Sequence, residues 1–155
     1  MKRRTFLAAT SKLSLAVTVP YSFSRRGFAA MLPSDLTSLS AVHLSQAIRE
    51  KHASCVEVMQ AYLSRIGKYN GVYNAIVSLQ SEQDLLKQAQ EADDELAAGK
   101  YRGWMHGMPH AVKDLAAVGG IRHTSGSLLY ADRIAEQDSA MVSRIRAAGA
   151  IFIGK

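Results

Sequence analysis

One lysine within an apolar run is the side chain of this sequence best suited to chemistry. Lys113 is flanked by apolar residues at 111–112 and 115–116, a pattern typical of a largely buried strand. Burial of an ammonium group costs several kcal/mol unless its charge is paired or its pKa falls. A lysine that is neutral near physiological pH can act as a general base. The alternative is that Lys113 pairs with a carboxylate such as Asp114 or extends its ammonium group to the strand end.

Three histidines and an acidic cluster are the other candidate chemical groups. The segment between His106 and His110 contains a Gly and a Pro, so the two do not share a helix face, and no carboxylate motif completes a site with His123. Structural or substrate-lining roles are therefore expected for all three. The acidic residues 93–95 are expected to form a solvated helix face, because consecutive helical residues point away from one another. Neither a metal nor an organic cofactor is predicted.

Three blocks of the sequence carry a resemblance to a known family. Residues 106–127 contain His-Gly-Met-Pro-His-Ala-Val-Lys-Asp and then Gly-Ile-Arg-His-Thr-Ser-Gly-Ser; residues 138–142 read Asp-Ser-Ala-Met-Val, and residues 146–155 end in Ile-Phe-Ile-Gly-Lys. In order and spacing they resemble the start of the amidase signature family, over about Leu36 to Lys155. In that family the lysine of the Val-Lys-Asp block serves a Ser, cis-Ser, Lys triad that hydrolyses amides. The resemblance implies that Lys113 is catalytic and that the substrate is a small-molecule amide.

The same resemblance implies that the nucleophile lies elsewhere. Both family serines belong to a Gly/Ser-rich segment downstream of the third block, beyond Lys155. Ser125 and Ser127 fall in the loop after the lysine strand, which in the family shapes the site without attacking the substrate. Residues 31–155 are therefore expected to be the N-terminal, truncated part of an amidase domain, inactive alone. The alternative is a noncatalytic remnant or interaction module whose exposed sheet edge needs a partner.

Three helices are predicted ahead of the lysine segment. Residues 40–51 have apolar side chains at helical spacing. Ser54 and Glu57 form a capping-box pattern that opens a second helix, which is expected to end at residues 70–71. Residues 72–79 have the composition of a strand, and a third helix over 82–98 is expected to end at Gly99.

The remaining segments predict the fold class. Residues 110–115 are expected to form the lysine strand, and Asp138 is expected to cap a helix that ends at Gly149. Residues 150–153 are expected to form a buried parallel strand, which completes a right-handed βαβ unit. The predicted fold is α/β, with N-terminal helices followed by the start of a mixed β-sheet with a βαβ crossover, an incomplete amidase signature fold.

Residues 1–30 resemble an export signal. A twin arginine at positions 3–4, followed by Thr-Phe-Leu and a weakly apolar stretch, is typical of a twin-arginine signal peptide. It predicts a periplasmic or extracellular protein, with cleavage after Ala29. The alternatives are a disordered basic tail, or translation from Met31 and a cytoplasmic protein. The stretch is too short and too polar for a stable membrane span.

Charge and cysteine content argue against a nucleic-acid-binding protein and against a fold held by an internal disulfide. The net charge is +6, and residues 1–30 hold six basic and no acidic residues, so the 13 basic and 13 acidic residues that follow balance. A neutral body has no electrostatic footprint for nucleic acid. The single cysteine, Cys55, cannot form an internal disulfide and is expected to be a small buried apolar residue. The oligomeric state is not predicted.

Overall fold

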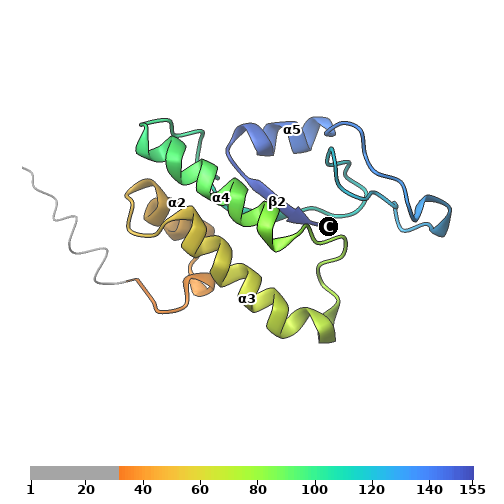
Figure 1. The fold of residues 1–155 in the computed structure, drawn as a ribbon, viewed down its shortest axis with the longest axis horizontal. Helices are drawn as coiled ribbons and strands as arrows, with labels where there is room; N and C mark the ends of the chain where they lie inside the picture. Colours follow the sequence, from red (N-terminus) through yellow and green to blue (C-terminus); the bar gives the residue numbers. More distant parts are fainter. Residues whose placement is uncertain (1–31) are drawn as a thin grey trace, which may run out of the picture.

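The computed structural model describes residues 32–155, so the predicted signal peptide lies outside the described residues. The helices are α2 (Ala41–Arg49), α3 (Cys55–Tyr73), α4 (Glu82–Ala97) and α5 (Ala140–Ala147), the strands are β1 (Pro109–Ala111) and β2 (Ile151–Gly154), and two 3-10 turns are η1 (Leu36–Ser38) and η2 (Leu128–Tyr130). Figure 1 shows α3 and α4 side by side, and both contact the sheet. No helix within residues 32–155 is long and apolar enough to cross a membrane.

The sheet forms through a parallel crossover, which confirms the predicted α/β class. β1 pairs with β2 in parallel, with Pro109 opposite Ile151 and His110 opposite Phe152, and α5 lies between the two strands in sequence. The predicted strand over 110–115 is wrong at its end. The register shifts after His110, and the chain then closes a turn in which the Ala116 amide donates to the Lys113 carbonyl oxygen (2.9 Å).

β2 separates two apolar cores because its side chains alternate between faces. Ile151 and Ile153 join the larger cluster with the buried faces of α2, α3 and α4. Phe152 points the other way and packs with Val142 of α5 in the smaller cluster. Every residue of β2 is buried, as expected for a parallel strand covered on both faces.

The capping box predicted at the start of α3 is confirmed. The Ser54 hydroxyl accepts from the Glu57 amide (3.1 Å), and the Glu57 carboxylate accepts from the Ser54 amide (2.8 Å). A second cap comes from α4, where the Asp93 carboxylate accepts from the amides of Cys55 (2.7 Å) and Val56 (3.1 Å). The solvated face predicted for residues 93–95 is therefore wrong at Asp93, whose helical position faces the start of α3.

The structure corrects the boundary between α3 and the segment that follows. The helix continues through residues 70–71 to Tyr73 and ends at Asn74, whose φ of 47° is left-handed. Residues 72–79 do not form the predicted strand: residues 72–73 still belong to α3, and Ser78 adopts a positive φ of 49°. Val77 nevertheless exchanges two backbone hydrogen bonds with Lys155 (2.8 and 2.9 Å), which ties this segment to the end of β2.

The helices predicted at 40–51 and 82–98 are confirmed as α2 and α4. Ser40 caps α2, with its hydroxyl accepting from the His43 amide (3.3 Å). Gly99 has a left-handed φ of 78° just beyond α4. Cys55 is fully buried, as predicted, and burial raises the pKa of its thiol with a further contribution from Asp93.

Gly107 is a position where the fold leaves no room for a side chain. Its φ is +71°, and a Cβ there would overlap the Cys55 thiol. Gly120 is the matched control, because its φ of +81° is similar while nothing lies within 4 Å of a Cβ. We expect Gly107→Ala to lower the free energy of unfolding by about 1–3 kcal/mol more than Gly120→Ala. Both variants place alanine at a positive φ, but only the alanine at position 107 would overlap another side chain. Urea unfolding followed by circular dichroism measures this difference, and equal losses would contradict it.

Candidate active site around Lys113

Lys113 lies on the turn that follows β1, outside the sheet. Its side chain is exposed among residues 32–155, so the predicted burial in a strand is wrong for this part of the chain. The physical reason is the early end of β1, since the turn of residues 113–116 carries the lysine away from the strand register. Its neighbour Asp114 directs its carboxylate to other groups, described next.

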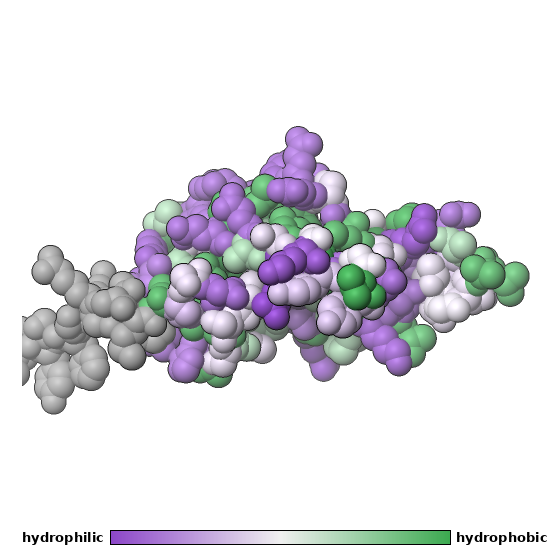
Figure 2. All heavy atoms as spheres, turned by 90° about the horizontal axis from the view of Figure 1, so that it is seen from below, coloured by the Kyte–Doolittle hydropathy of each residue, from purple (hydrophilic) through white to green (hydrophobic). Residues whose placement is uncertain are grey.

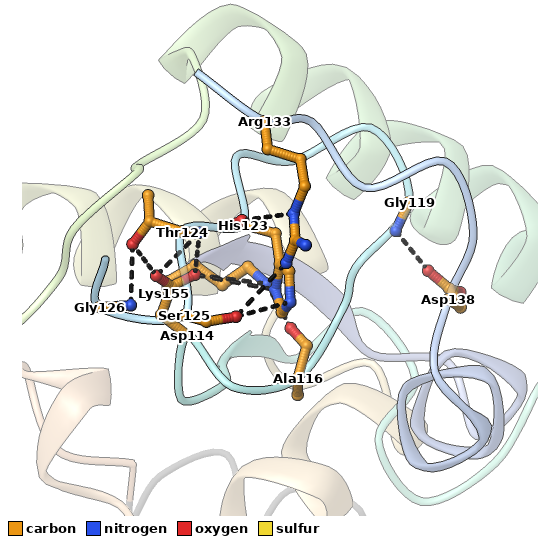
Figure 3. Close-up of polar contacts among 10 residues, drawn as sticks. All are labelled: Asp114, Ala116, Gly119, His123, Thr124, Ser125, Gly126, Arg133, Asp138 and Lys155. Atoms are coloured by element: carbon orange, nitrogen blue, oxygen red, sulfur yellow. Dashed lines mark hydrogen bonds and ion pairs between the residues drawn. The ribbon is translucent and has the colours of Figure 1, made fainter. Parts of the chain in front are cut away.

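The Asp114 carboxylate organises the residues around this turn (Figure 3). It accepts from the Thr124 amide (3.1 Å) and from the Thr124 hydroxyl (2.5 Å). His123 Nδ1 lies 3.9 Å from one of its oxygens, and Lys155 Nζ lies 4.0 Å from the same oxygen. Burial acts to raise the pKa of Asp114, but the hydrogen bonds from Thr124 outweigh it and the pKa is lowered. Asp114 is therefore an anion that joins the lysine turn to the loop at residues 123–126.

Lys155 is the buried lysine of the site. Its side chain has no exposed surface, and its Nζ donates to the carbonyl oxygen of Ala116. Burial lowers its pKa, and the Asp114 carboxylate opposes this shift. No role is predicted for Lys155 from the sequence, although it carries the same signal as Lys113, a cation next to an apolar run at 150–153.

His123 and Ser125 lie together in the loop after Lys113. Ser125 Oγ is 3.3 Å from His123 Nε2, and Arg133 donates to the same hydroxyl (3.3 Å) and to the His123 carbonyl oxygen (3.0 Å). The Ser127 hydroxyl accepts from the Leu129 amide (3.3 Å) at the start of η2. Both serines thus take part in the hydrogen bonds that shape this loop.

The other two histidines make structural contacts. His106 is buried; its Nδ1 accepts from the Arg102 amide (3.2 Å), so its Nε2 donates to the Ala92 carbonyl oxygen (2.9 Å). His110 lies edge-on to Phe152, with ring centroids 5.6 Å apart, and burial lowers its pKa. Among residues 32–155, no three His, Cys, Asp or Glu side chains are arranged to hold a metal.

Asp138 holds the far end of the loop instead of capping α5 as predicted. The N-cap residue of α5 is Ser139, whose side chain makes no cap bond, and the Asp138 carboxylate is engaged by other groups. It accepts from the Gly119 amide (2.8 Å) and from two nitrogens of Arg146 (2.6 and 3.0 Å). The loop that begins after Lys113 is thereby attached to α5.

Comparison with known proteins decides the family. The protein-family model described as Amidase matches residues 57–155. The chain belongs to the amidase family. The predicted resemblance is confirmed, and its blocks are those that surround Lys113, Asp138 and Lys155.

Two named relatives of this family member align with most of the chain. It is 39% identical over 121 residues to a glutamyl-tRNA(Gln) amidotransferase subunit of Salinispora tropica, covering 78% of this chain and 24% of that protein. It is 35% identical over 125 residues to an acylamidase of Rhodococcus erythropolis, covering 81% of this chain and 26% of that protein.

Solved structures of the family share this fold. The peptide amidase of Stenotrophomonas maltophilia matches with a TM-score of 0.71 and 29% identity, over 79% of this chain and 25% of that one. A fatty acid amide hydrolase matches with a TM-score of 0.72 and 25% identity, over 87% of this chain and 24% of that one. The family member described here thus spans about a quarter of the length of these relatives.

The Asp138 contact predicts a pH dependence of stability. The hydrogen bonds from Arg146 lower the pKa of Asp138 in the folded state. A lowered folded pKa contributes stability above the unfolded value, near 3.9, and that contribution is lost as the pH falls through the folded pKa. We expect Asp138→Asn to lower the free energy of unfolding at pH 7 by about 1–2 kcal/mol and to flatten its decline below about pH 4.

Asp132→Asn is the control for this measurement. The Asp132 carboxylate is 98% exposed and lies 3.9 Å from Arg122, so its ion pair is screened by solvent. Urea unfolding of the three proteins from pH 7 to pH 2 gives the comparison. A parallel decline of the wild type and Asp138→Asn would contradict the assignment.

Proposed function

We propose that this chain is the N-terminal part of an amidase that hydrolyses the C–N bond of a carboxamide through a Ser, cis-Ser, Lys mechanism. The observation that carries the proposal is the match of residues 57–155 to the amidase family, with Lys113 in the Val-Lys-Asp block. The names of its relatives, an acylamidase and a peptide amidase among them, support a carboxamide as the substrate.

Lys113 is the proposed general base. In its neutral form it withdraws a proton from a bridging serine, which in turn deprotonates the nucleophilic serine for attack on the carbonyl carbon. The proton is then returned to the leaving amine as the C–N bond breaks. Both serines are proposed to follow Lys155 in the complete domain. Lys113 is exposed in residues 32–155 and is thus open to such partners.

An exposed apolar surface also supports a longer domain. Leu128 and Leu129 of η2 are 94% and 89% exposed, and Leu115 in the lysine turn is 64% exposed. Figure 2 shows hydrophobic side chains at the end of the molecule formed by this loop. Large apolar side chains that are this exposed indicate an interface, and we propose that the rest of the amidase domain covers them.

The first test reads the gene beyond the Lys155 codon and then measures the encoded protein. We expect an open frame with a Gly/Ser-rich segment that supplies two serines, and release of ammonia or amine from aliphatic, aryl or peptide carboxamides. A stop codon directly after Lys155 would overturn the proposal and leave a noncatalytic interaction module.

The second test substitutes the proposed base. Lys113→Ala is expected to lower kcat/KM for amide hydrolysis by at least about a hundredfold. Lys113→Arg is expected to fail equally, because a guanidinium stays protonated. Lys100→Ala, at an exposed lysine after α4, is the matched control and is expected to keep wild-type turnover. Full activity of Lys113→Ala would refute the role of the lysine.

Residues 1–30 carry a separate proposal, export through the twin-arginine route. The support is the twin arginine at positions 3–4 followed by Phe6 and Leu7, together with the absence of any acidic residue in this segment. We expect the secreted protein to begin after Ala29, as N-terminal sequencing would show. Soluble cytoplasmic protein that retains Met1 would refute export.

A further inference from the structure

Lys155 is a charged side chain held in an apolar position. The residue is 5% exposed and follows three buried residues of β2 whose side chains fill both cores. Taking an ammonium group out of water costs several kcal/mol unless the protein supplies partners. The partners of Lys155 therefore indicate why a lysine is placed there.

Both partners of the Lys155 ammonium belong to the turn that carries Lys113 (Figure 3). The ammonium donates to the carbonyl oxygen of Ala116, the last residue of the turn, and lies 4.0 Å from the carboxylate of Asp114, the second residue. The turn itself closes through the bond from the Ala116 amide to the Lys113 carbonyl oxygen (2.9 Å). Lys155 thus holds this turn at two points, on either side of Leu115.

The backbone of Lys155 is fixed as well. Its amide donates to the Val77 carbonyl oxygen (2.9 Å), and its carbonyl oxygen accepts from the Val77 amide (2.8 Å). The side chain therefore extends from a rigid attachment at the end of β2 to a turn that has left the sheet. The turn is also tied to the loop by the bonds from Thr124 to Asp114, but its side chains at Lys113 and Leu115 are both exposed.

We infer that Lys155 is the positioning residue for Lys113, holding the turn of residues 113–116 against β2 and neutralising the Asp114 carboxylate beside the proposed base. This role rests on the proposed function in one respect, that Lys113 is the general base. The contact itself is a property of the folded chain.

Neutralising the Asp114 carboxylate favours the neutral form of Lys113. An uncompensated carboxylate next to a lysine favours the ammonium form, which cannot accept a proton. The titratable groups that face Asp114 are Lys155 and His123, and Arg133 lies behind His123 through its bond to that residue's carbonyl oxygen. Lys155 is the cation among them that also bonds to the turn.

The test measures the protonation of Lys113 without requiring turnover. In the full chain that the gene encodes, trace acetylation by acetic anhydride over a range of pH, read by mass spectrometry, gives the midpoint at which Lys113 becomes reactive. Lys155→Met is expected to raise this midpoint by about 0.3–0.5 pH unit, the size of the interaction with one charge roughly 6–10 Å away across water. Asp114→Asn is expected to lower it by a similar amount, and the double variant is expected to return it to the wild-type value. Lys100→Met, at an exposed lysine, is the control.

Activity provides a second readout on the same variants. Lys155→Met is expected to lower kcat by about ten- to hundredfold through misplacement of the base. The acid limb of the pH profile of kcat/KM is expected to shift to higher pH. The double variant is expected to restore the limb but not the full kcat, since the bond to Ala116 stays lost.

Each outcome decides the inference. An unchanged midpoint in Lys155→Met, or equal shifts in the single and double variants, would overturn it. If Lys155→Met does not fold by circular dichroism, Lys155→Gln, whose amide can still donate to the Ala116 carbonyl oxygen, removes the charge alone, and an unchanged midpoint in this variant would overturn the inference. A wild type that hydrolyses no amide, with the midpoint shifts present, would refute the proposed function while leaving the contact established.

Discussion

The parallel pairing of β1 with β2 is the constraint on which the rest of the structure depends. Two strands of three and four residues are short, and they persist because β2 is buried on both faces. Ile151 and Ile153 meet the helices α2 to α4, and Phe152 meets α5, so the strand is the shared wall of two cores. Full burial of a side chain such as Phe152 contributes about 1.5–3 kcal/mol. A change in the register of β2 would therefore disturb both cores at once.

The same pairing determines where chemistry can occur. β1 and β2 are parallel, so their carboxyl ends lie at one edge of the sheet. Lys113 follows β1 and Lys155 follows β2 at that edge, where open α/β sheets place their functional sites. The loop from Gly119 to Ser127 returns to this edge through the bonds of Thr124 to Asp114 and of Gly119 to Asp138. The fold thus brings together two lysines that are far apart in the chain.

Much of this arrangement could be predicted from the sequence, and the failures have physical causes. Helices predicted from local signals, such as the capping box at Ser54 and Glu57, are present in the structure because those signals depend on only a few neighbouring residues. The strand predicted at 72–79 failed because α3 extends into it and because Asn74 and Ser78 adopt left-handed conformations that composition does not reveal. For the site, the family blocks located Lys113, but its burial was assigned from a run of apolar neighbours, and only the tertiary structure shows that Lys155 is the buried lysine. The roles of Asp93 and Asp138 depend on contacts between elements distant in sequence, which periodicity cannot indicate.

The burial of Cys55 has a consequence for how this protein can be followed in solution. The thiol lies under Gly107, has no exposed surface, and has a raised pKa because of burial. A thiol reagent that needs the thiolate can reach it only when α3 and the segment at Gly107 separate. As the single cysteine of the chain, Cys55 is an intrinsic reporter whose rate of modification counts the openings of the larger core.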